Sequence, residues 1–262
     1  MQREPNRIKD WLGSLLGEVV RDRSRHCCRL GGALTKPNKA RSGVGFLLRS
    51  AQLTLLVIES SGVIMVSSIP QHLSPQDYLD WEPLQGLRYE YIDGEVYAMV
   101  GGTLPHSEIA VNLTTLLKNH LRGKGCRVLG SDAKLGITES GPFFFADGSV
   151  TCDSRDRGSI KFCRYPCLVA EVLSPSTEAY DRGGKFAQYR CLESLQEYVL
   201  ISSDRITVEI FRLNERGKWE LTPYAEGETI QLSSVDLQFP IEQLYEDVEL
   251  ADPSGLELPT AD

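Results

Sequence analysis

Two carboxylic acids lie in or beside apolar stretches of the chain. Glu171 is the one charged residue within residues 167–174, and Asp147 follows the aromatic run 143–145 and Ala146. A buried carboxylate costs several kcal/mol unless a cation or strong donors satisfy it. If neighbouring strands bring both acids to the same end, a divalent cation relieves their repulsion, and Mg²⁺ takes one or two carboxylates together with water and phosphate oxygens. The pair therefore predicts a metal site for phosphate chemistry.

A lysine on the segment after Glu171 is the third candidate. Lys185 ends the sequence Asp-Arg-Gly-Gly-Lys, which begins at Asp181. On a helix that packs back on the sheet, its ammonium would reach the same site, orient an attacking water and stabilise the charge of a pentacovalent phosphorane. Plainer interpretations stay open: Asp147 as a turn residue before Gly148, and Lys185 as the surface i,i+4 partner of Asp181.

A strand–helix–strand unit must position these side chains. Residues 167–173 and 197–202 are typical of buried strands, and residues 176–193 of a helix whose start is signalled by Ser-Pro-Ser-Thr-Glu at 174–178. This spacing indicates a crossover between parallel strands. Open α/β sheets bind ligands beyond their strand ends, so the expected cleft lies there.

Other patterns place the remaining elements. Ser74 and Pro75 predict a helix to about Trp81, and Asp93-Gly94 joins a hairpin of residues 89–92 and 95–99. Apolar spacing predicts a helix over residues 105–121, ended by Gly123 and Gly125. Further strands are expected at residues 127–137, 143–152, 206–213 and 219–224.

Charge divides the chain into regions. The net charge is −8, which argues against a nucleic-acid partner unless a local basic patch exists. Residues 1–64 carry eleven Lys/Arg and five Asp/Glu, a net of +6, which leaves −14 for the rest. We expect a basic extension over residues 1–64 outside the core, with Met65 as an alternative start, then one domain over residues 65–247 and an acidic tail over residues 248–262.

Cysteine usage and hydropathy bear on the compartment. The seven cysteines are odd in number and no secretory signal precedes them, so we expect reduced thiols and a cytoplasmic protein. No uncharged apolar run of about 18 residues occurs, so the sequence predicts no membrane-spanning helix.

The residues above carry a resemblance to a known family. The chain from about residue 73 to residue 247 resembles the Uma-two family, within the restriction-endonuclease-like PD-(D/E)XK superfamily. The matching stretches are Tyr89-Glu-Tyr-Ile-Asp-Gly-Glu95, Pro105-His106, Ala146-Asp147, Thr151-Cys-Asp153, Glu171-Val-Leu-Ser-Pro-Ser-Thr177, Asp181-Arg-Gly-Gly-Lys185 through Tyr189, and Leu195-Gln-Glu-Tyr198.

The resemblance implies an α/β fold with a mixed central sheet flanked by helices and a metal-dependent phosphodiesterase site. Asp147 then matches the acid of the PD motif and Glu171 the acid of the (D/E)XK motif, both holding Mg²⁺ or Mn²⁺. Leu173 stands at the motif's lysine position, and Lys185 on the next helix takes that role. Ala146 replaces the proline of the PD motif, which loosens the backbone before the acid.

Further residues are accessory candidates. His106 either faces the site or is an exposed residue at a helix start, and Glu95, like Glu90, is either a site acid or a solvent-facing strand position. Basic residues cluster near the site in sequence, either as a phosphate track or as a solvated face. The candidates carried forward for phosphate binding are Lys134, Arg182 and Arg190.

Two functions of different classes follow. The first is a Mg²⁺-dependent DNA endonuclease acting on double-stranded DNA, with no membrane partner and with a homodimer left open. The second is a catalytically decayed module of the same fold that binds DNA or protein as an adaptor. Survival of Asp147, Glu171 and Lys185 favours the enzyme, whereas Ala146 and the net acidity favour the adaptor.

Overall fold

The computed structural model describes residues 58–59, 62–63, 72–99 and 101–250 of the chain. Most of the expected basic extension, Met65 and most of the expected acidic tail lie outside these residues. None of the helices in these ranges has the length and hydropathy that crossing a bilayer requires.

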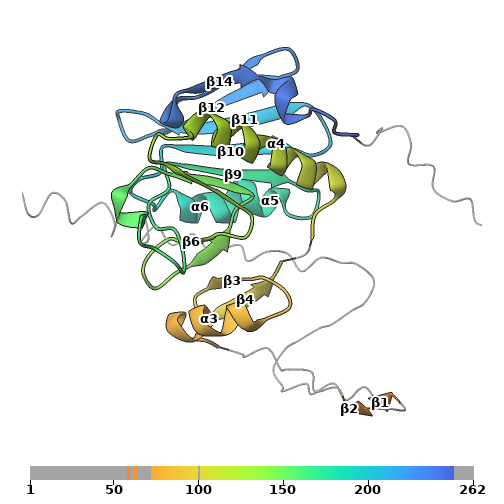
Figure 1. Ribbon diagram of the computed structural model, residues 1–262, viewed down its shortest axis with the longest axis vertical. Helices are drawn as coiled ribbons and strands as arrows, with labels where there is room; N and C mark the ends of the chain where they lie inside the picture. Colours follow the sequence, from red (N-terminus) through yellow and green to blue (C-terminus); the bar gives the residue numbers. More distant parts are fainter. Residues whose placement is uncertain (1–57, 60–61, 64–71, 100, 251–262) are drawn as a thin grey trace, which may run out of the picture.

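The described chain alternates short strands with few helices (Figure 1). The helical segments are α3 (Pro75–Trp81), η1 (Glu82–Leu84), α4 (Leu104–Leu121), η2 (Ser154–Asp156), α5 (Glu178–Tyr180), η3 (Asp181–Lys185), α6 (Phe186–Tyr189), η4 (Ser233–Val235) and η5 (Ile241–Leu244). The strands are β1 (Ile58–Glu59), β2 (Gly62–Val63), β3 (Tyr89–Ile92), β4 (Glu95–Ala98), β5 (Arg127–Gly130), β6 (Lys134–Gly136), β7 (Phe143–Phe145), β8 (Gly148–Thr151), β9 (Leu168–Leu173), β10 (Glu197–Ser202), β11 (Thr207–Leu213), β12 (Trp219–Ala225), β13 (Thr229–Leu232) and β14 (Leu237–Pro240).

A six-stranded mixed sheet in the order β12-β11-β10-β9-β8-β5 forms the centre. β9 and β10 are parallel and joined through the helical segment between them, which confirms the crossover. All other neighbouring strands of this sheet are antiparallel. A four-stranded sheet, β4-β3-β7-β6, lies beside it (Figure 1). The expected α/β fold with a mixed central sheet flanked by helices is confirmed.

The two faces of β9 meet different helices. Leu168, Ala170 and Val172 pack in one core cluster with the buried side of α4. Val169 and Leu173 pack in a second cluster with Phe186 and Tyr189 of α6 and its flanks. Because side chains alternate along a strand, Glu171 belongs to the second face, under α6.

The most N-terminal described helix and hairpin are as expected. Ser74 caps α3 by accepting from the Asp77 backbone N–H at 3.2 Å, with Pro75 at the first helical position. β3 and β4 pair antiparallel about Asp93-Gly94, where both residues have positive φ. Such a turn matches the twist of a hairpin, and Gly adopts positive φ without steric cost.

Two expected strands are each divided between two sheets. Residues 127–137 give β5 in the six-stranded sheet and β6 in the four-stranded one, and residues 143–152 give β7 and β8 in the same way. β5 pairs with β8 and β6 with β7, so one long hairpin bends where it passes from one sheet to the other. Neither stretch carries a break in its sequence pattern at the bend, so the pattern predicts one continuous strand in each case.

The helix expected over residues 176–193 is shorter and interrupted. Its helical turns run from Glu178 to Tyr189, and residues Asp181–Lys185 form a π-turn. Gly183 and Gly184 lower helix stability there, and π-turns are frequent at functional sites. The strands β13 and β14 were not expected from the sequence.

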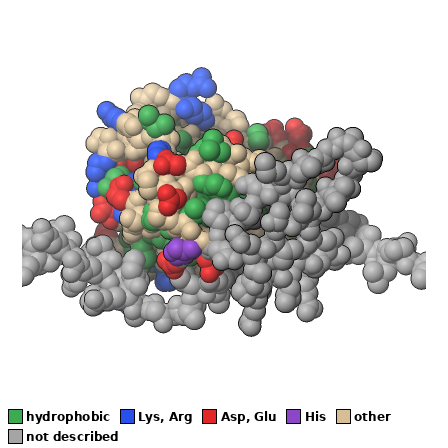
Figure 2. Space-filling model, turned by 90° about the horizontal axis from the view of Figure 1, so that it is seen from below, with side chains coloured by type: hydrophobic (Ala, Val, Ile, Leu, Met, Phe, Trp, Pro, Cys, Tyr) green, Lys and Arg blue, Asp and Glu red, His purple; other side chains and the backbone are tan. Residues whose placement is uncertain are grey.

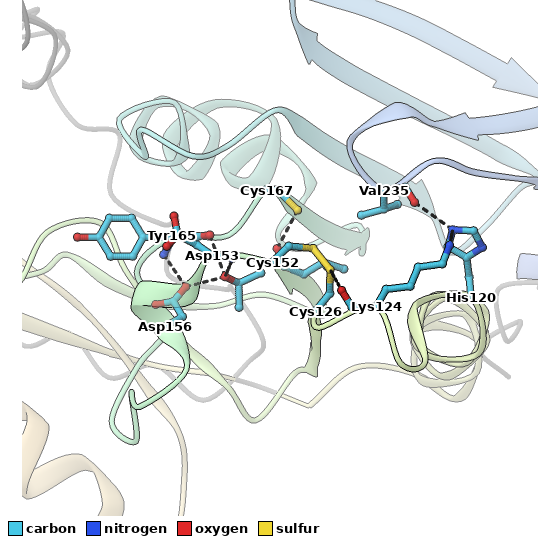
Figure 3. The surroundings of a disulfide bond; sticks show 11 residues. His120, Lys124, Cys126, Cys152, Asp153, Asp156, Tyr165, Cys167 and Val235 are labelled. Carbon is cyan, nitrogen blue, oxygen red and sulfur yellow. Dashed lines mark hydrogen bonds between the residues drawn. A yellow bond between two sulfur atoms is a disulfide. The ribbon is translucent and has the colours of Figure 1, made fainter.

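Cys126 and Cys152 form a disulfide (Figure 3). They stand just beyond the Arg127–Thr151 pair at the end of the β5–β8 ladder, with Cα atoms 4.1 Å apart. The expectation of reduced thiols is therefore wrong for this pair, because strand pairing brings together cysteines that are 26 residues apart. Cys163 and Cys167 are buried thiols outside this disulfide.

Candidate active site

Glu171 is a buried carboxylate on the face of the sheet that α6 covers. Its position in the middle of β9 leaves the residue 3% exposed. One oxygen, Oε1, accepts from the Tyr189 hydroxyl at 2.9 Å and lies 3.2 Å from Lys185 Nζ. Oε2 accepts no hydrogen bond from the part of the chain that the structure describes. Burial raises the pKa of this carboxyl well above its usual range, against the opposing effect of the Lys185 charge.

Lys185 lies among three carboxylates. Its Nζ is 3.0 Å from Glu90 Oε1, 3.2 Å from Glu171 Oε1 and 3.6 Å from Asp181 Oδ1. It also donates to the Phe145 carbonyl at 3.4 Å. The side chains of Lys185 and Asp181 are 8% and 4% exposed, so the interpretation as a solvent-exposed surface pair is excluded.

The cluster of Glu90, Glu171, Asp181 and Lys185, which we call the acid cluster, holds one ammonium for three carboxyls. Burial raises the pKa of Glu90 and of Asp181, with the Lys185 charge acting in the opposite direction. Burial by itself would lower the pKa of Lys185, but the attraction of the three acids raises it above its usual range. The ammonium therefore stays charged, whereas the carboxyls resist full ionisation.

Asp147 lies beside this cluster, in the turn between β7 and β8. The ladder pairs Gly148 with Ala170, so Asp147 stands across from Glu171 on the neighbouring strand. Its Oδ2 accepts from the Val172 backbone N–H at 2.8 Å. This bond fixes the carboxylate against β9, whereas a turn residue alone would not need it.

His106 reaches Asp147 from the first turn of α4. Thr103 caps that helix, with its hydroxyl oxygen accepting from the His106 N–H at 3.4 Å. His106 Nε2 lies 3.2 Å from Asp147 Oδ2. This hydrogen bond raises the pKa of the imidazole, and partial burial offsets some of the effect. The structure thus places His106 on the site, as one of the two sequence interpretations has it.

The two glutamates of the first hairpin have different roles. Glu95 on β4 is exposed and accepts from the Tyr97 hydroxyl at 2.5 Å. Glu90 on β3 is 6% exposed and accepts from the Phe145 N–H at 3.3 Å in addition to its contact with Lys185. Glu95 was the accessory candidate kept from the sequence, whereas the structure places Glu90 against Lys185. No sequence signal separates the two, because Glu90 and Glu95 are each the one charged residue of a short strand.

The cations chosen for phosphate binding are engaged elsewhere. Lys134 is 8% exposed and pairs with Glu82 at 2.7 Å, above the Tyr78 ring. Arg182 pairs with Glu178 and Glu209. Arg190 is exposed, with its guanidinium 5.0 Å from the Phe186 ring centroid. We therefore do not retain Lys134 and Arg182 as phosphate contacts.

One face of the molecule shows how charged side chains are distributed at the surface. Figure 2 shows one face of the molecule, on which a histidine lies beside acidic side chains while most Lys and Arg side chains lie towards the top and left. Acidic side chains also lie among the Lys and Arg side chains on the left of this face, so charges of both signs are interspersed there (Figure 2).

Asp147 and Glu171 offer oxygen ligands of the kind that a divalent cation takes. No group of three or more His, Cys, Asp or Glu side chains in the described residues is arranged to hold a metal ion. Two carboxylates are enough for Mg²⁺, which keeps several waters and substrate oxygens. Asp147 and Glu171 each give one oxygen to protein donors, and the second oxygen of each accepts nothing from the described residues. The pair fits the chemistry of a Mg²⁺ or Mn²⁺ site.

Comparisons with known proteins identify the family and the fold of the chain. Residues 75–242 match the model of Uma2, described as "Putative restriction endonuclease". "Uncharacterized protein slr1290" of Synechocystis sp. is 47% identical to this chain, and the match covers 66% of this chain and 91% of that protein. "Uncharacterized protein sll1609" of the same organism is 31% identical, and the match covers 61% of this chain and 91% of that protein. A crystal structure of "a putative nuclease belonging to DUF820" from Anabaena variabilis has a TM-score of 0.55 and 19% identity, and the match covers 66% of this chain and 98% of that one. That likeness shows a shared fold.

Proposed function

The chain belongs to the Uma2 family, and from this premise we propose that it is a metal-dependent endonuclease that hydrolyses phosphodiester bonds of double-stranded DNA. One observation carries the proposal most strongly. Asp147 and Glu171 stand across from each other on adjacent strands, each with one oxygen unused by the described residues, beside a buried ammonium. Such a grouping is expensive to bury and has no need to exist for folding alone.

Asp147 and Glu171 would hold Mg²⁺ or Mn²⁺, which when bound polarises the phosphate and lowers the pKa of its water. His106 and the Val172 N–H orient the Asp147 carboxylate, and Tyr189 orients that of Glu171. These bonds limit each acid to one position, and preorganisation of this kind is what makes charged groups effective in catalysis.

Lys185 would stabilise the negative charge that develops on the phosphorane. Its Nζ lies 3.2 Å from the Glu171 carboxylate, which would be one of the metal ligands. Glu90 and Asp181 keep the ammonium charged and in position, so both are positioning residues.

The adaptor alternative is favoured by Ala146, because the proline of the PD motif would have stiffened the backbone before the acid. In this chain other contacts supply that stiffness. Ala146 is 2% exposed, and the next residue, Asp147, is held by Val172 and His106. The missing proline therefore does not argue for a collapsed site.

Incubation of the protein with supercoiled plasmid DNA in Mg²⁺, Mn²⁺ or EDTA tests the proposal. We expect nicking or linearisation with either metal, none with EDTA, and loss of cleavage in Asp147→Asn. Asp132→Asn is the matched control, because that side chain is 94% exposed and its ion pair is with Arg88 at the surface. Cleavage that survives in Asp147→Asn, or no cleavage by the folded wild-type protein with either metal, contradicts the proposal.

A further inference from the structure

A basic segment follows the start of α4. No Asp or Glu occurs in residues 109–131, which carry Lys118, Arg122, Lys124 and Arg127 together with His120. Glu108 and Asp132 bound the segment. In a chain with a net charge of −8, this is a local basic patch of the kind that a nucleic-acid partner requires.

A groove lies along this segment, between α4 and β5. Its volume is about 350 Å³. β5 is the last strand of the six-stranded sheet, so its outer edge has no strand partner among the described residues. The lining residues are Thr114, Thr115, Lys118, Asn119, Val128 and Gly130.

The groove begins next to the catalytic acids. Gly130 pairs with Gly148 in the β5–β8 ladder, and Gly148 directly follows Asp147. Side chains alternate along a strand, so Gly130 and Gly148 lie on the α4 face and Asp147 and Glu171 on the other. The helix wall of the groove starts at the site, because His106 Nε2 in the first turn of α4 lies 3.2 Å from Asp147 Oδ2. At the other end, Lys118 is twelve residues beyond His106 on α4, or about 18 Å along the helix axis. That distance matches about five base-pair steps of duplex DNA.

Lys118 in the groove, and Arg122 four residues further on at the end of α4, are available for a ligand. Lys118 and Arg122 are exposed, and neither forms an ion pair with a carboxylate of the described residues. Arg122 donates to Asn119 Oδ1 at 3.3 Å, and Lys124 Nζ lies 3.0 Å from His120 Nε2 (Figure 3). This contrasts with Lys134 and Arg182, whose charges are already met by carboxylates.

We propose that the α4–β5 groove binds the phosphodiester backbone of duplex DNA on one side of the scissile phosphate, with Lys118 and Arg122 as phosphate contacts. The inference rests on the proposed nuclease function and extends it to a substrate-binding surface. The Thr115 and Asn119 side chains at the same groove would add neutral hydrogen bonds to backbone oxygens. Such contacts fix register and affinity without reading the base sequence.

Binding of the full-length protein to a fluorescein-labelled 20-base-pair duplex tests this inference. Fluorescence polarisation is measured in EDTA at several salt concentrations, with Asp147→Asn in the background to prevent cleavage. We expect K118A/R122A to weaken binding about tenfold and to reduce the slope of log affinity against log salt by about 2, since each lost phosphate contact removes about 0.9. R216A/K218A removes the same charges from the exposed β11–β12 turn and is the matched control, with an expected slope change near zero.

The outcomes separate this inference from the function on which it rests. An unchanged slope in K118A/R122A, with the duplex bound and the wild-type protein cleaving plasmid DNA, overturns the groove and leaves the nuclease intact. Equal slope changes in both double variants also overturn it, because the effect would then be one of net charge. If K118A/R122A leaves DNA binding unchanged and converts a dimer to a monomer in gel filtration, the groove joins two copies and the inference is wrong. Failure of the wild-type protein both to bind and to cleave DNA overturns the nuclease and the groove together.

Discussion

Two buried carboxylates of this protein, Glu171 and Asp156, are satisfied in opposite ways. Asp156 is 0% exposed, and both of its oxygens accept from neutral donors. Oδ1 takes the Arg164 N–H at 2.9 Å, and Oδ2 takes the Thr151 hydroxyl at 2.8 Å, the Tyr165 N–H at 2.9 Å and the Cys163 thiol at 3.3 Å. Glu171 has donors on one oxygen only and shares its cation with Glu90 and Asp181.

The difference supports a structural role for Asp156 and the proposed metal-binding role for Glu171. A buried acceptor whose oxygens all have donors stabilises the loop that supplies them, and losing it leaves those donors unpaired. A buried acid that shares one ammonium with two other acids is held at a cost to the fold, which is common where a site must bind charge. The number and kind of donors around a buried acid therefore separate a structural carboxylate from a catalytic one.

The largest expected effect is the difference in cleavage rate between Glu171→Gln and Asp156→Asn. Glu171→Gln removes a proposed metal ligand, and we expect plasmid cleavage in Mg²⁺ to fall by about 10³-fold or more. Asp156→Asn touches no atom of the site, so its cleavage rate per folded molecule should match the wild type. Single-turnover cleavage, corrected for the folded fraction by circular dichroism, measures both. Equal losses in the two variants would show that the donor count does not distinguish the two acids.

Lys185→Met and Asp181→Asn sharpen the comparison within the acid cluster. Loss of the ammonium should lower the cleavage rate by about 10²-fold, the usual scale for one preorganised electrostatic group. Mn²⁺ binding by calorimetry should persist or tighten, because the three carboxylates lose their competing cation. Asp181→Asn leaves Lys185 with two acids and should have a much smaller effect on rate. Small and equal effects of both changes would favour the non-catalytic adaptor.

The free energy of unfolding should respond in the opposite order, with Asp156→Asn as the more damaging change. Asp156→Asn turns an amide N–H₂ towards backbone and hydroxyl donors, and we expect it to lower the free energy of unfolding by about 1–3 kcal/mol. Urea unfolding followed by circular dichroism measures this change as a shift in midpoint. Glu197 offers a second structural acid for comparison, since it accepts from Arg212, Ser233 and Ser234. An unchanged urea midpoint for Asp156→Asn would contradict the structural role of Asp156.

The smallest effect is on the pH dependence of stability without metal. Folded Glu171 keeps its proton to higher pH than unfolded Glu171, because burial raises its pKa. The folded state therefore binds more protons than the unfolded state above the ordinary carboxyl pKa of about 4.3, and wild-type stability falls as the pH rises through that window. Glu171→Gln lacks this loss, so its melting temperature in EDTA should exceed the wild-type value by a few degrees near pH 7.5 and by less near pH 4. A difference that is constant or shrinks with rising pH would contradict the shift.

Local patterns were sufficient for much of the fold. Ser74-Pro75 and Asp93-Gly94 carry their own backbone chemistry, so α3 and the β3–β4 hairpin were predicted with their bounds almost unchanged. The apolar run around Glu171 predicted a buried strand with one charge that needs a partner. Those predictions depend on residues near each other in sequence, where steric preference and capping act directly.

Partners across the sheets could not be predicted from the chain alone. The same pattern of a glutamate in an aromatic strand fits both Glu90 and Glu95 until the register of β3 against β7 decides which one is buried. Lys134 looks like any basic residue near the site, and only its approach to Glu82 from another element removes it from the surface. The pairing of Cys126 with Cys152 depends on the β5–β8 register in the same way.

The sequence by itself determined the identities of the reactive groups, the parallel crossover that carries Glu171 and Lys185, and the charge balance of the chain. The tertiary structure decided which charges meet. It brought Glu90 to Lys185, His106 to Asp147, and the acid-free segment 109–131 into a groove between α4 and β5. The physical reason is that backbone propensity acts over a few residues, whereas burial and ion pairing act over a few ångströms between segments that only the packed sheets make neighbours.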